Sequence, residues 1–154
     1  MHRLESVSAD NTDRKIVIAQ MIRLIHSISR KFGNEMTKIM KGRVSASQFI
    51  MLRFLKQCGP AKVSQISRKM QLTPSAITFM TKDLLERDLI ERQRDTKDRR
   101  VVYISITQEG LEVVEEIEAS IRQSTEILLS NLTNLDLSNI VYILEKLDTS
   151  LAMA

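Results

Sequence analysis

The clearest hydrophobic pattern in the chain lies between Lys62 and Arg87, where apolar residues recur every three to four positions in two consecutive blocks. This spacing predicts two short amphipathic helices, Lys62–Met70 and Pro74–Arg87. Thr73 can cap the first amides of the second helix, and Pro74 fits its first position because no N–H is needed there. The expected buried stripes are Val63, Ile66 and Met70, and then Ile77, Met80 and Leu84.

The second helix keeps small, polar and cationic residues on its outward side. They are Ser75, Ala76, Thr78, Phe79 and Lys82. Two helices joined by a short turn, the second with such a face, form the helix-turn-helix pattern of DNA-binding proteins. Ser75, Thr78 and Lys82 can serve bases or phosphates, whereas Ala76 or Phe79 could touch thymine methyl groups. For Phe79, inward packing against Ile66 or the following hairpin is an equal alternative.

A β-hairpin is predicted directly after this helix. Leu89–Arg94 and Arg100–Ile106 flank a polar turn, and the second segment alternates and is rich in β-branched residues. Lys97, Arg99 and Arg100 at the tip are too cationic for a core. The combination predicts a winged helix-turn-helix, mainly α-helical with a small β-hairpin wing. Its second helix suits the major groove, and its wing suits phosphates or a narrow minor groove.

The wing resembles that of the multiple-antibiotic-resistance regulator (MarR) family of bacterial transcription factors. Asp98-Arg99-Arg100, a short strand and then Ile106-Thr107-Gln108-Glu109-Gly110 are similar to the family signature D-x-R, a strand and L-T-x-x-G. The resemblance implies that Asp98 braces a wing arginine and that Arg100 faces the groove. Strand alternation alone places one of Arg99 and Arg100 on the DNA side and leaves open which.

The segments around the second helix also fit this family. Its entry, Leu72-Thr73-Pro74-Ser75, and its exit, Leu84 followed by Leu89-Ile90-Glu91-Arg92, both match. The chain departs from the family at Phe79, where Arg is common, and at Asp88, where Gly is common. Asp88 is expected at the helix end in a left-handed conformation, which Asp tolerates less well than Gly.

Longer amphipathic helices are predicted on both sides of the winged helix. They are a first helix from Asn11 or Thr12 to Met40 after a frayed Met1–Asp10, then Ala46–Gln57 behind a Ser45–Gln48 capping box, Thr107 to about Ser130, and Asp136 to Leu151. We interpret residues 1–154 as one domain, with a DNA-binding lobe at 46–106 and a dimerisation region at 11–40 and 107–154. The apolar stripes are wider than one subunit needs, which favours a homodimer over a monomer with a central helix.

Charge is distributed unevenly along the chain. Residues 1–61 hold eleven Lys or Arg against four acids, residues 62–100 ten against six, and residues 101–154 two against nine. Such polarity favours a protein that places one end on a polyanion. No apolar run reaches the length of a membrane span, the start does not resemble a signal peptide, and one cysteine fits a reducing cytoplasm.

Two other function classes compete with DNA binding. An enzyme is disfavoured because the sequence has no phosphate loop, metal-ligand cluster or nucleophile elbow, so no catalytic residue, metal or cofactor is expected. A winged helix used only for protein–protein contact would not need the cations of the wing. The expected function is therefore a dimeric regulator, most simply a repressor, that binds a near-palindromic operator in double-stranded DNA.

The family resemblance further implies an effector, a small aromatic acid or phenol bound between the dimer helices and the DNA-binding lobe. Arg23, His26 and Arg30 share one face of the first helix beside an apolar stripe. A guanidinium beside an apolar wall suits an aromatic carboxylate. The competing interpretation, which the sequence favours, is a solvated basic face or a patch that simply adds to the attraction for DNA. The operator, the regulated genes and the effector do not follow from the sequence.

Overall fold

The fold is described from a computed structural model, which covers the backbone of residues 2–95 and 101–152 and the side chains of residues 13–95 and 101–150. The described chain is mainly helical, with three short strands. In sequence they are α1 (His2–Met40), α2 (Ala46–Cys58), β1 (Ala61–Lys62), α3 (Val63–Met70), α4 (Pro74–Glu86), β2 (Ile90–Arg94), β3 (Val102–Ile106), α5 (Gln108–Leu129) and α6 (Asn134–Ala152).

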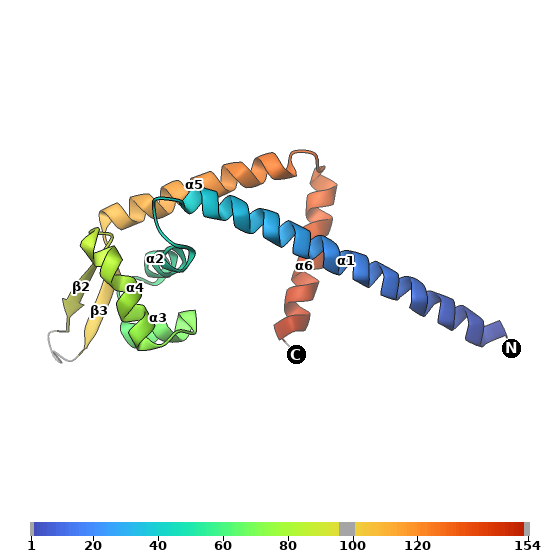
Figure 1. The fold of residues 1–154 in the computed structure, drawn as a ribbon, viewed down its shortest axis with the longest axis horizontal. Coiled ribbons are helices and arrows are strands. Elements are labelled where there is room, and N and C mark those ends of the chain that lie inside the picture. Colours follow the sequence, from blue (N-terminus) through green and yellow to red (C-terminus); the bar gives the residue numbers. More distant parts are fainter. Residues whose placement is uncertain (1, 96–100, 153–154) are drawn as a thin grey trace.

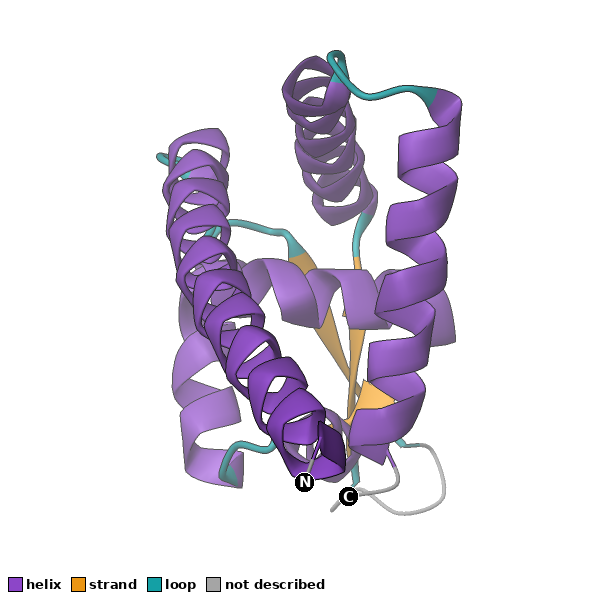
Figure 2. Ribbon diagram, turned by 90° about the vertical axis from the view of Figure 1, so that its right-hand side faces the viewer, coloured by secondary structure: helices purple, strands orange, loops and turns teal. Residues whose placement is uncertain are grey.

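The elements form a small lobe and a set of long helices that extend from it (Figure 1). The lobe contains α2, α3, α4 and the three strands. The last turns of α1 pack on α5 next to the lobe, and the far end of α5 leads into α6. In Figure 2, α1 and α6 run along opposite sides of the view as separate helices. The N-terminus therefore lies at the opposite end of the molecule from β2 and β3.

The starts of α2 and α4 follow from the capping residues in the sequence. The hydroxyl of Ser45 accepts the amide of Gln48 at 3.2 Å, and the Gln48 side chain accepts the amide of Ser45 at 2.8 Å. Thr73 accepts the amide of Ala76 at 3.2 Å, with Pro74 in the first turn. Both predicted caps are confirmed, and they satisfy amides that have no partner within their helix.

The sheet has three antiparallel strands in the order β1-β3-β2. Ile104 of the central strand is opposite Ala61 on one side and Arg92 on the other, and its side chain is fully buried. The hairpin of β2 and β3 is the predicted one. β1 was not predicted, because two residues are too few to show an alternating pattern. Its pairing joins the chain before the helix-turn-helix to the wing.

The core lies where α2, α3 and α4 meet the sheet and the first turns of α5. The buried apolar residues are Met40, Val44, Phe49, Met51, Leu52, Leu55, Ala61, Ile66, Ile77, Leu84, Leu89, Ile90, Ile104, Val114 and Ile117. The predicted stripes of α3 and α4 are confirmed at Ile66, Ile77 and Leu84, with Met80 packed against this cluster. This core holds α4 in one orientation relative to the wing strands.

One expectation about the long helices is wrong. α1 begins at His2 and not at Asn11 or Thr12, because no proline or glycine interrupts the first residues and a helix can propagate through them. At the far end of α5 the side chain of Leu128 is 63% exposed, because α5 has left the lobe by that point.

Candidate nucleic-acid interface

The outward face of α4 carries the residues predicted to meet DNA. Ser75, Thr78, Phe79 and Lys82 are exposed, and Ala76 is half-buried. Phe79 is 83% exposed, so the alternative in which it packs inward is wrong. The opposite side of the helix is anchored in the core by Ile77 and Leu84. The lobe thus presents one polar and aromatic face of α4 to solvent, where a groove of DNA could reach it.

Thr81 is a fully buried polar residue of α4 that sequence reasoning missed. Its hydroxyl donates to the carbonyl of Thr78 at 3.0 Å and accepts from Nη2 of Arg92 at 2.9 Å. Because a buried hydroxyl without a partner is costly, this pairing stabilises the packing of β2 on α4. The signal was present in the sequence, since Ile77, Thr81 and Leu84 share the inward helical spacing.

Arg92 is the second residue that sequence reasoning missed. It is exposed on β2, and with Ser75, Thr78, Phe79 and Lys82 it lines a hollow of about 740 Å³ on the surface of α4. The hydrogen bond to Thr81 fixes one end of its guanidinium. Arg92 of β2 and Lys82 of α4 therefore line the same hollow, and their two charges raise the positive potential where the anionic backbone of DNA would lie.

Polar contacts at the C-terminal half of α4 fix the helix to its neighbours. Asp83 accepts Nε2 of Gln48 from α2 at 2.9 Å and pairs with Arg87 at 3.5 Å. Lys82 lies 3.9 Å from Glu86, with both side chains largely exposed. An exposed pair of this kind is weak, so Lys82 can exchange Glu86 for a phosphate at little cost.

Two residues adopt the left-handed conformation at the ends of the recognition elements. Gln71 has φ 54° in the turn between α3 and α4, and Asp88 has φ 53° after α4, as expected for Asp88. The carbonyl of Asp88 accepts the hydroxyl of Thr107 at 2.6 Å, and that hydroxyl also caps Gly110 at 3.0 Å. Thr107 thereby ties the end of α4 to the start of α5.

The predicted wing tip lies outside the described residues. This applies to Lys97, Asp98, Arg99 and Arg100. The strands that lead to it are described, and the amide of Asp95 donates to the carbonyl of Val101 at 3.0 Å. β2 and β3 therefore hold Asp95 and Val101 next to each other, and β2 packs against α4 (Figure 1).

Ion pairs connect the lobe to α5. Lys56 of α2 lies 3.1 Å from Glu118 and 3.4 Å from Glu115, and Arg53 lies 3.1 Å from Glu118. The hydrogen bond and charge of Glu118 raise the pKa of Lys56 above its ordinary value, with a smaller contribution from Glu115. Arg43 lies 3.3 Å from Glu116. Glu115, Glu116 and Glu118 of α5 thus pair with α2 and the loop before it.

The residues predicted to bind an effector lie in the exposed part of α1. Arg23, His26 and Arg30 are exposed, and none of them lines the cavity of about 640 Å³ at the end of this helix. The structure therefore does not bring these three side chains into that cavity.

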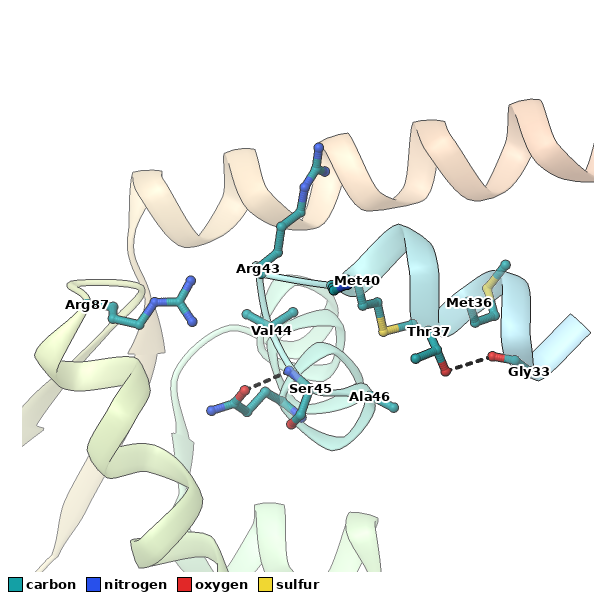
Figure 3. Close-up of a pocket in the computed structure, with 12 residues that line it drawn as sticks. Gly33, Met36, Thr37, Met40, Arg43, Val44, Ser45, Ala46 and Arg87 are labelled. Carbon is teal, nitrogen blue, oxygen red and sulfur yellow. Dashed lines mark hydrogen bonds between the residues drawn. The ribbon is translucent and has the colours of Figure 1, made fainter.

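That cavity lies between the end of α1, the start of α2 and α4 (Figure 3). Met36, Met40 and Val44 supply apolar surface, and Arg87 extends from α4 toward Val44. It combines an apolar wall with a cation at the junction between the lobe and the long helices. The α1 pattern in the sequence did not indicate it, because Arg87 reaches the cavity only through the tertiary fold.

The long helices expose a large apolar surface. Its residues are Ile16, Val17, Ile18, Met21, Ile22, Leu24, Ile25, Ile28 and Phe32 on α1, Ile127 and Leu128 on α5, and Leu135, Ile140, Val141, Tyr142, Ile143, Leu144 and Leu147 on α6. Within the described residues no single helix is long and apolar enough to cross a membrane; α5 and α6 reach that length and composition only together, across a bend of 114°. Exposed patches larger than a few hundred Å² mark interaction surfaces.

A helix-turn-helix with an exposed polar face on its second helix, followed by a β-hairpin, defines a winged-helix DNA-binding protein. Residues 44–102 match the model of the MarR family. The chain is 36% identical over 124 residues to the HTH-type transcriptional repressor MdtR of Bacillus subtilis (strain 168), covering 80% of each chain. The chain belongs to the MarR family, and it is a DNA-binding transcription regulator and not an enzyme.

Solved structures share this fold. The YusO protein from Bacillus subtilis is 33% identical, with a TM-score of 0.78 over 86% of this chain and 95% of that chain. A mutant of MepR from S. aureus, solved bound to an oligodeoxyribonucleotide, is 22% identical, with a TM-score of 0.66 over 85% of this chain and 97% of that chain. The winged-helix fold predicted from the sequence is confirmed.

Proposed function

We propose that the chain is a homodimeric, cytoplasmic repressor that reads a near-palindromic operator. In this proposal α4 enters the major groove, and the wing lies along the backbone with one arginine in the minor groove. The observation that carries it is the exposed face of α4, where Ser75, Thr78, Phe79 and Lys82 stand beside Arg92. Two heads related by a two-fold axis read half-sites about one helical turn, roughly 34–36 Å, apart.

The first experiment is a gel shift at increasing salt, with duplexes recovered by selection from random DNA. Lys82→Ala should weaken binding and, if Lys82 contacts only phosphate, lower the salt slope by about one unit per head. Lys146→Ala on α6 removes the same charge far from the lobe and should leave binding unchanged. The alternative, a winged helix that binds only protein, requires that no duplex is selected and that neither substitution matters.

The wing is tested separately, because its role rests on the sequence. Arg100→Ala, and secondarily Arg99→Ala, should weaken operator binding by about 1–3 kcal/mol without unfolding the protein. Equal affinity of both variants and the unmodified chain at physiological salt would contradict the role given to the wing, including the bracing role of Asp98.

The proposed dimer is supported by the apolar surface of α1, α5 and α6. Leu144 is 58% exposed and Leu147 is 44% exposed in the single chain, and both would become buried against a second copy. Leu144→Glu should give a monomer in light scattering at micromolar concentration. It should also abolish tight operator binding, because two weak heads are no longer linked. A monomer that still binds a palindrome tightly would refute this arrangement.

We further propose that a small aromatic acid or phenol regulates DNA binding, as the family resemblance implies. The two candidate places are the α1 face with Arg23, His26 and Arg30 and the cavity that Arg87 borders. Salicylate titrated against the free protein and against the DNA complex should bind the two with unequal affinity, since only a difference can shift the equilibrium. Arg30→Ala and Arg87→Ala then separate the two places, and absence of binding at millimolar concentration would exclude this effector class.

A further inference from the structure

Phe79 forms a ridge on the surface of α4. Its ring is 83% exposed, and it borders two separate hollows. One hollow, of about 740 Å³, lies toward Arg92 of β2. The other, of about 640 Å³, lies toward Gln48 of α2. Because the ring projects between these two hollows, it can enter a groove of a bound molecule while the two walls of that groove fill the hollows.

The neighbours of Phe79 on the same helix face are polar. Ser75 precedes it by four residues and Lys82 follows it by three, so the three side chains line up along the outward side of α4. An isolated exposed apolar residue is common on protein surfaces. Here, however, the apolar residue occupies the middle of the face that meets DNA, between a hydroxyl and an ammonium that can bind bases or phosphates. A phenyl ring can neither donate nor accept a conventional hydrogen bond there.

The major groove of B-DNA offers one apolar group to such a side chain, the C5-methyl group of thymine. We propose that Phe79 is a specificity-determining residue that reads one thymine methyl in each half-site of the operator. This inference rests on the proposed function, in which α4 enters the major groove. Ala76, the other apolar residue of the face, is half-buried and does not project as far. Ser75 and Lys82 then fix the register of the ring along the groove.

The test uses the full chain and the duplex recovered by selection from random DNA. Thymines are replaced one symmetric pair at a time by deoxyuridine, which removes the methyl group and nothing else. At one pair the affinity of the unmodified protein should fall about fourfold per half-site, or roughly 15-fold for both, the effect expected for one buried methyl group each. At the other thymines the affinity should stay nearly constant.

Variants then assign the effect to Phe79. Phe79→Ala should bind the thymine and deoxyuridine duplexes equally, and Phe79→Leu should keep part of the difference. Ile50→Ala removes another exposed apolar side chain, from α2, and should keep all of it. Because Phe79 is exposed, its variants should retain the thermal midpoint of the unmodified chain, which separates a contact effect from a folding effect.

Three outcomes would overturn the inference while leaving the proposed function intact. They are an operator at which no deoxyuridine pair changes the affinity, a thymine effect that persists in Phe79→Ala, and a Phe79→Ala variant that binds every duplex like the unmodified chain. In contrast, the proposed function itself would be refuted if selection recovered no duplex and if the protein's affinity for random DNA did not depend on salt. The two failures are therefore distinguishable in the same set of measurements.

Discussion

At Gly110 the first turn of α5 lies close to the backbone that follows the helix-turn-helix. A Cβ atom at this position would lie 2.1 Å from the carbonyl oxygen of Leu89 and 2.7 Å from Cγ1 of Ile106. The Leu89 carbonyl also accepts the amide of Thr107 at 3.2 Å, so it cannot move without losing that hydrogen bond. Gly110→Ala is therefore expected to destabilise the lobe, although alanine is the better helix former.

The expected size follows from three contributions. Alanine in place of glycine inside a helix favours folding by up to about 1 kcal/mol. Forcing a methyl group into a closed contact costs about 1–3 kcal/mol. Loss of the hydrogen bond between Thr107 and Leu89 costs about 1 kcal/mol more. Gly110→Ala should thus lower the free energy of unfolding by about 1–3 kcal/mol, because the two steric consequences outweigh the helix preference.

Urea denaturation of both proteins at one protein concentration measures this difference. Gly33→Ala is the matched control, because its Cβ would have no atom within 4 Å on an exposed stretch of α1. The control should raise the free energy of unfolding by about 0.5–1 kcal/mol, opposite in sign to Gly110→Ala. A Gly110→Ala protein as stable as the unmodified chain would refute the argument, since the close approach would then impose no constraint.

Three further changes have defined outcomes. Asp88→Gly should raise the free energy of unfolding by about 0.5–1 kcal/mol in a thermal or urea melt, because residue 88 has φ 53°. Because the pKa of Lys56 is raised in the folded protein, its stabilising contribution is complete at neutral pH and is lost as the pH rises through the raised value. Lys56→Gln should therefore destabilise the folded protein at pH 7 and make little difference at strongly alkaline pH. Glu86→Gln frees Lys82 from a neighbouring acid and should tighten binding to operator and random duplexes alike in gel shifts; a gain for the operator alone would indicate that Glu86 contacts a base.

Most of the fold follows from local signals in the sequence. The 3.6-residue spacing and the caps at Ser45, Thr73 and Thr107 define where α2, α4 and α5 begin. The start of α1 could not be placed, since Ser6, Ser8, Asp10, Asn11 and Thr12 are all possible N-cap residues and no proline or glycine decides between them. β1 could not be found at all, because its two residues are a strand only through their pairing with β3.

The candidate site is predictable only where it lies on one element. Helical spacing alone identifies the outward face of α4, including Lys82. Helical spacing does not predict Arg92, because its position beside that face depends on how β2 packs on α4 through the hydrogen bond to Thr81. The cavity near Arg87 has the same origin, as the tertiary fold brings Arg87 against the distant stretch 33–48. The exposure of Phe79 also required the tertiary fold, since its helical position fits either face of the lobe.

The pairing of β1 with β3 closes a long loop in the chain, from Ala61 to Ile104, and the whole helix-turn-helix lies within that loop. Loop closure costs entropy that the packing of α3 and α4 within the loop must offset, so we expect the β1–β3 pairing and that packing to form together. The lobe should therefore open and close as one cooperative unit in native-state hydrogen exchange, with amides of α3 and β3 sharing one opening free energy. A partly folded lobe that exposes a formed α4 without the wing strands should then be weakly populated. DNA binding would accordingly be gained or lost together with the whole lobe.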